Sequence, residues 1–120
     1  MVKVKEHEIM GEKHYFCFSL RALNAASVKF GGINNVFEAI DGPNSAENVA
    51  FLAAALMDAG HRYALRNGLQ DQEPLTADDL LDELSYAEII KLKDIILSTV
   101  GNDSEAEVAV ESEGNPPEAR

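Results

Sequence analysis

The chain has 120 residues, of which 46% are hydrophobic, and a formal net charge of −11 from 21 acidic and 10 basic side chains. This length suits one small domain with its own core, which we expect over residues 1–101. The charge argues against direct nucleic-acid binding, because contacts to phosphates need basic side chains. The longest apolar run, 49–57, is too short to cross a membrane, and the first residues lack the apolar segment of a secretory signal. We therefore expect a cytoplasmic protein with no membrane association, and the single cysteine, Cys17, agrees with a reducing compartment.

Residues 2–18 predict an N-terminal β-hairpin, because β-branched, aromatic and alternating residues flank a glycine at position 11. Two registers fit this pattern. In one, residues 10–11 form the turn, and Glu8 faces Lys13 while Val4 faces Cys17. In the other, residues 11–12 form a type II′ turn and Ile9 faces His14. The sequence does not distinguish the two.

Helical periodicity follows the hairpin. The first helix is expected over residues 19–30, with Ser19 as N-cap and two glycines after it as a stop. A short second helix is expected over 33–40, before a turn at 41–44. Ser45 then caps the longest helix, 46–66, whose alanines let a neighbouring helix approach closely. Gly60 lies inside this helix and predicts a break or kink there.

Two further helices complete the expected fold. Residues 77–84 follow a threonine that suits a helix start, and residues 86–100 follow a capping box formed by Ser85 and Glu88. A glycine and an asparagine at 101–102 predict the end of the last helix. Residues 102–120 carry six acidic groups against one arginine and are expected to be disordered. The predicted class is therefore α+β, a hairpin followed by four to five helices and an acidic tail.

No reacting group stands out. The three histidines lack a metal-ligand spacing, and one cysteine cannot build a zinc site, so no metal or cofactor is expected. His7 and His14 can meet across the hairpin, where we expect them to be solvated. Cys17 lies between two phenylalanines and is expected in the core. The acidic residues of 78–83 are expected to form a solvated helix face rather than an acid and base pair, so an enzyme is not predicted.

The region around the second helix is the most apolar short element, and it is the candidate partner-binding site. Two interpretations remain open. A surplus of exposed apolar side chains would mark an interaction surface, whereas the same side chains could simply complete the core. The candidate residues are Phe30, Ile33, Val36, Phe37 and Ile40.

The order of these features resembles the small tail assembly chaperones of long-tailed bacteriophages and prophages. The resemblance covers residues 8–101. It rests on the hairpin turn at Gly11, the strand 15–18, the helix that starts at 20–23 and ends at 30–33, the alanine-rich helix, and the loop at 75–80 before a short acidic helix.

The resemblance implies a non-enzymatic protein of the host cytoplasm. Such a protein coats the long hydrophobic tape measure protein, helps recruit tail tube subunits and can self-associate. The alternative is a small acidic regulator or inhibitor that binds a basic protein surface through residues 71–88 and the tail. Salt would separate the two, because a charge-driven complex weakens at high ionic strength.

Overall fold

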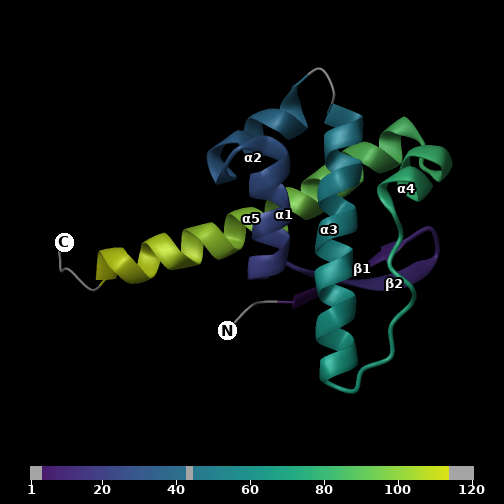
Figure 1. Ribbon diagram of the computed structural model, residues 1–120, viewed down its shortest axis with the longest axis horizontal. Helices are drawn as coiled ribbons and strands as arrows, with labels where there is room; N and C mark the ends of the chain where they lie inside the picture. The colour runs from purple at the N-terminus through teal and green to yellow at the C-terminus, as the bar shows by residue number, and fades with distance from the viewer. Residues whose placement is uncertain (1–3, 43–44, 114–120) are drawn as a thin grey trace.

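The computed structural model describes residues 4–42 and 45–113, and for Ile33 and residues 101–113 it describes the backbone alone. A two-stranded antiparallel hairpin is followed by five helices in this part of the chain, which confirms the predicted α+β fold (Figure 1). The elements are β1 (Val4–Ile9), β2 (Glu12–Cys17), α1 (Leu20–Phe30), α2 (Ile33–Asp41), α3 (Ser45–Arg66), α4 (Ala77–Glu83) and α5 (Tyr86–Glu113).

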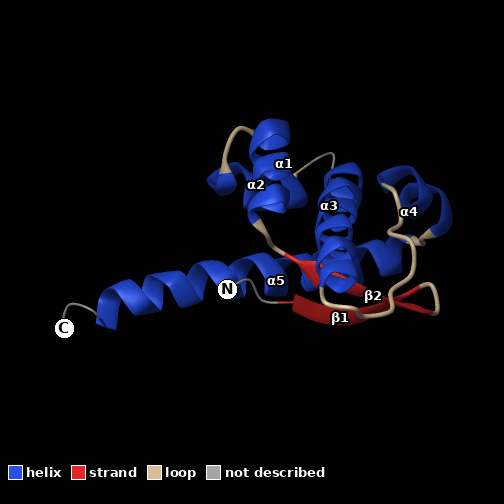
Figure 2. Cartoon of the chain, turned by 60° about the horizontal axis from the view of Figure 1, so that its bottom comes forward, coloured by secondary structure: helices blue, strands red, loops and turns tan. Residues whose placement is uncertain are grey.

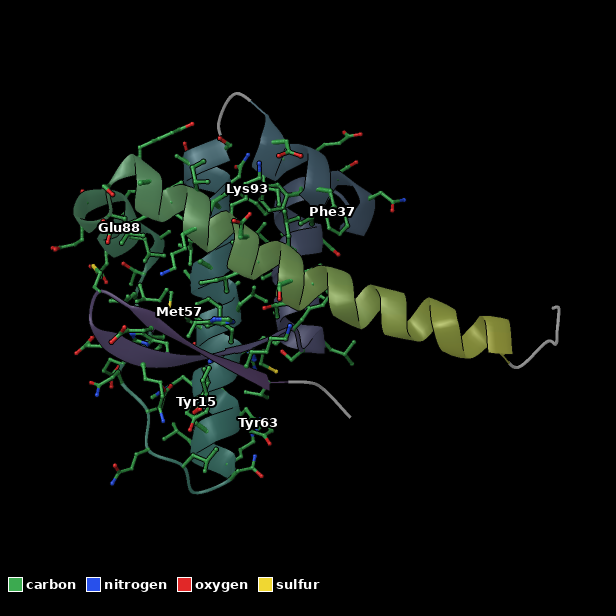
Figure 3. All side chains as sticks on the ribbon, turned by 180° about the vertical axis from the view of Figure 1, so that it is seen from behind. Tyr15, Phe37, Met57, Tyr63, Glu88 and Lys93 are labelled. Atoms are coloured by element: carbon green, nitrogen blue, oxygen red, sulfur yellow. The ribbon has the colours of Figure 1, made fainter. Side chains whose placement is uncertain are left out.

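Helix α3 is the centre of the fold. It contacts β2 and each of the other four helices. Figure 1 shows α3 in front of the hairpin and α5, and Figure 3, from behind, shows both of them in front of α3. One core joins all layers, because β2, α2, α3, α4 and α5 each bury large apolar side chains in it. Examples are Phe16, Val36, Leu56, Leu80 and Ile96.

The hairpin adopts the register in which Met10 and Gly11 form the turn. Val4 pairs with Cys17 and Glu8 with Lys13. Both turn residues have positive φ, 52° at Met10 and 81° at Gly11, which is the type I′ geometry that matches the right-handed twist of the strands. The structure thus decides between the two registers that the sequence left open.

The two hairpin histidines lie directly opposite each other, and the expectation that both are solvated is wrong. His14 is only 1% exposed, and neither of its ring nitrogens has a hydrogen-bond partner among the described residues. His7 is half-buried and packs edge-on against Phe16, with ring centroids 5.4 Å apart. The hairpin therefore buries imidazole rings as part of its apolar face, because the helices cover that face.

Gly60 is the point at which α3 meets β2, and it does not break the helix. A Cβ atom at residue 60 would lie 2.9 Å from the backbone nitrogen of Phe16 and would overlap the Tyr15 carbonyl group still more closely. Only glycine lets the backbones approach this far. The glycine that predicted a kink instead serves close packing, and α3 runs unbroken over Ser45–Arg66.

Capping hydrogen bonds place the helix starts where the sequence predicts them. Ser19 accepts from the backbone of Ala22, and Thr76 and Asp79 form a reciprocal capping box. Ser85 and Glu88 form another, with distances of 2.9 and 3.2 Å, and the hydrogen bonds from Ser85 lower the pKa of Glu88. The bounds of α1 to α4 differ from prediction by one residue, and Ser45, predicted as a cap, is the first residue of α3. The turn at 41–44 lies partly outside the described residues.

Helix α5 is longer than predicted. It passes through residues 101–102, where the glycine and asparagine predict its end. It then continues to Glu113, through part of the segment predicted to be disordered. Glycine costs only about 1 kcal/mol inside a helix, and the alanines and glutamates of 105–113 favour helix. Residues 114–120 of the predicted tail lie outside the described residues.

Replacing Gly60 with alanine should destabilise the protein by about 3 kcal/mol, because the added methyl group must displace the β2 backbone. The comparison is Gly101→Ala, also in a helix, which helix propensity predicts to be stabilising by up to about 1 kcal/mol. Urea unfolding followed by circular dichroism measures both. A Gly60→Ala protein as stable as the wild type would contradict the close approach of α3 and β2.

The stability of the protein should fall as the pH drops below about 6.5, partly through His7. Burial, reinforced by the charge of Lys5, lowers the pKa of His7 below its usual 6.5. At a pH between the pKa of His7 in the folded state and its higher pKa in the unfolded state, His7 binds a proton in the unfolded chain but not in the folded chain. Acidification therefore favours unfolding. His7→Phe keeps the packing against Phe16 and removes this titration. The loss in urea midpoint between pH 7.5 and 5.5 should be smaller in the variant; equal losses would argue against the assignment.

Candidate partner-binding surface

The apolar stripe of α2 mostly completes the core. Val36 and Ile40 are 1% and 0% exposed, so they are not available to a partner in this conformation. Phe30 and Phe37 are half-buried and pack against the core. The side chain of Ile33 lies outside the described residues. The five candidate residues therefore do not form one exposed patch, because α2 folds back on α1 and α3 and buries the inner side of its stripe.

Polar contacts hold α2 in this position. Lys93 of α5 forms an ion pair with Asp41 at the end of α2, and the Asn48 side chain donates to the carbonyl oxygen of Ala39 at 2.8 Å. Figure 3 shows Phe37 and Lys93 from α2 and α5 on the same side of the molecule. A partner that used the inner face of α2 would have to break these contacts.

A shallow groove beside α3 is better exposed. It has a volume of about 410 Å³, and small residues form most of its floor. We call it the alanine groove. It lies between α1, the outer face of α3, and the segment that leads into α4. Its lining residues are Ala25, Phe51, Ala54, Ala55, Asp58, Pro74, Leu75, Thr76 and Ala77.

Aromatic rings mark one end of the alanine groove. Phe51 contacts Phe30 edge to face, with ring centroids 5.8 Å apart, and Lys29 Nζ lies 5.4 Å from the centre of the Phe51 ring. One residue of the predicted site, Phe30, thus contacts a side chain that lines the groove, although Phe30 is not part of the lining. The sequence signal for the groove was the run of alanines at 50–55, which fits a groove for a partner helix and internal helix packing equally well.

A second hollow, of about 360 Å³, lies where α1 begins and α3 ends. We call it the arginine hollow, because it holds Arg21, Arg62 and Arg66, three of the four arginines in the sequence. Cys17, Ser19, Leu20, Ala59 and Tyr63 complete its lining. The Asp58–Arg62 ion pair, 3.1 Å long, joins it to the alanine groove, because Asp58 lines the groove and Arg62 lines the hollow.

The loop between α3 and α4 is anchored by a histidine and a carboxylate. His61 Nδ1 lies 2.9 Å from Asp71 Oδ2, and the Asp71 side chain is only 1% exposed. This contact bridges α3 and a loop without regular structure, so it fixes the path of the chain toward Pro74 and Leu75 (Figure 2). The sequence placed Asp71 in the acidic surface 71–88 of the alternative function, but its burial against His61 removes it from that surface. The pairing itself was not predicted, because ten residues separate the two side chains.

The residues that the structure describes contain no cluster of three histidine, cysteine or acidic side chains able to hold a metal ion. Cys17 is buried, as predicted, and the acidic residues of 78–83 are exposed on α4. Within the described part of the chain, no helix combines the length and apolar character that crossing a bilayer requires. Comparisons with protein-family models, curated proteins and solved structures found no match.

Removing the Asp71 carboxylate should loosen the loop that forms one wall of the alanine groove. We expect Asp71→Ala to cost about 1–3 kcal/mol and to accelerate amide hydrogen exchange over residues 69–75, because a buried hydrogen bond to His61 is lost. Glu73→Ala, at an exposed position in the same loop, is the matched control and should leave both quantities unchanged. Equal exchange in the two variants would show that the His61 contact does not hold the loop.

Proposed function

We propose that this chain is a non-enzymatic tail assembly chaperone of a bacteriophage or prophage. In this role it works in the host cytoplasm, binds the tape measure protein and helps recruit tail tube subunits. The proposal rests on the resemblance in the order of sequence features, and one structural observation supports it. That observation is the alanine groove, an apolar surface beside the central helix with room for part of another helix.

The chemistry of the alanine groove suits an apolar helical segment. Ala25, Ala54 and Ala55 project little, so a partner helix can approach the backbones of α1 and α3 closely. Phe51 and Leu75 flank this floor and offer larger apolar contacts. A groove of this kind binds any helix whose apolar side chains recur at three- and four-residue spacing, rather than one specific ligand. A chaperone for a long hydrophobic protein needs such tolerance, because it must cover many different stretches.

The acidic regulator remains the second candidate, and the exposure of the carboxylates on α4 favours it. Asp78, Asp82 and Glu83 are all exposed, although Asp79 also serves the capping box of its own helix. Such a surface attracts basic partners over long range but loses that attraction as salt screens it. The two functions therefore differ in their response to ionic strength.

Co-expression with the tape measure protein of the same genome tests the proposal. We expect the two proteins to co-purify at about 500 mM salt, because burial of apolar surface is not screened. Ala55→Asp should weaken this capture about hundredfold, since an unpaired carboxylate in an apolar contact costs a few kcal/mol. Ala87→Asp places the same charge at an exposed site on α5 and serves as the control.

Circular dichroism must first show that both variants fold. Capture of the tape measure protein by Ala55→Asp at wild-type strength would rule out the alanine groove as its binding site. Loss of wild-type capture at high salt, together with binding of basic proteins at low salt, would favour the acidic regulator.

A further inference from the structure

The arginine hollow concentrates positive charge in a strongly acidic chain. Arg21, Arg62 and Arg66 line it, although acidic residues outnumber basic ones by 21 to 10 in the sequence. Arg62 is paired with Asp58, whereas Arg21 and Arg66 have no ion pair within the described residues. Two exposed guanidinium groups therefore remain available for carboxylates from outside this fold.

Apolar side chains accompany these arginines. Leu20 lines the hollow and is 80% exposed, and Leu65, beside Arg66 in sequence, is 63% exposed. The Tyr63 ring adds further contact area. Large apolar groups held this far into solvent next to free cations suit an occupant that carries carboxylates and aliphatic side chains together.

The C-terminal segment of the same chain has this composition. Residues 102–120 contain Asp103 and five glutamates against Arg120, a net charge of −5. Small aliphatic residues lie between the acids, at 106 and at 108–110. We propose that the arginine hollow binds residues 102–120 of a second copy of this chain.

The direction of α5 favours a second copy over the chain's own tail. Residues 101–113 continue the helix for about 20 Å beyond residue 100. Figure 1 shows this end of α5 projecting from the body, and Figure 3 shows the same from behind, far from the lower end of α3 that carries Arg66. A helix that points outward places residues 101–113 nearer to a neighbouring copy than to the hollow of its own chain. The resulting contact is head-to-tail, so each copy offers both a hollow and a tail, and the association can continue into chains or rings.

Two full-length variants and their mixture test this pairing. The first, Arg21→Glu with Arg66→Glu, lacks the basic hollow but keeps the acidic segment. The second replaces the glutamates at positions 105, 107, 111 and 113 with glutamine and keeps the hollow. The control is Lys13→Glu with Lys91→Glu, an equal change of charge at exposed lysines that line neither the hollow nor the alanine groove.

Sedimentation equilibrium at about 50 mM salt should show concentration-dependent association of the wild type and of the lysine control. Each test variant alone should associate at least about tenfold more weakly, as should the wild type at about 500 mM salt. The mixture should recover a one-to-one complex, because one variant supplies the tail and the other the hollow.

A wild type that stays monomeric at every concentration would overturn the pairing, as would a mixture that does not associate. Protection of Arg21 and Arg66 in a monomer would instead indicate that the tail folds onto its own hollow. This inference does not rest on the chaperone function. A test variant that stops associating but still captures the tape measure protein would leave the proposed function intact.

Discussion

The contact between Gly60 of α3 and the β2 backbone sets the geometry of the whole molecule. A helix packed on a strand normally keeps a distance set by side chains, but here the helix surface reaches the carbonyl group of Tyr15. This approach brings α3 close enough to the hairpin to cover His14 and Phe16. It also makes α3 the common support of the hairpin and the other helices, since every other helix contacts it.

A central helix that neighbouring elements cover on one side can bind a partner on its opposite side. The inner stripe of α3, including Leu52, Leu56 and Ala59, is buried, whereas Phe51, Ala55 and Asp58 lie at its partly exposed edge. Helix α1 and the loop anchored by His61 then flank this edge without covering it. The alanine groove follows from packing. Small residues that let α1 approach α3 also leave a floor on which another helix can rest.

The sequence predicted what local patterns control. Ser19, Thr76 and Ser85 cap helices as expected, because capping depends on residues three positions apart. The sequence did not predict the features that depend on contacts between residues far apart in the chain. The burial of His14 depends on the helices that cover the hairpin, and the role of Gly60 depends on β2, so the local pattern predicted neither residue correctly.

The local pattern left two interpretations of the apolar stripe in α2 open for the same reason. The apolar spacing in α2 is that of any amphipathic helix, and only its neighbours decide whether Val36 and Ile40 face a partner or the core. The arginine hollow is harder still to find, because its cations come from distant parts of the chain. Arg21 lies in the first turn of α1, and Arg66 is the last residue of α3. The net charge of a sequence segment does not show such a cluster, because its arginines lie far apart in the chain. The fold concentrates it, so a strongly acidic protein can still present a local surface that attracts carboxylates.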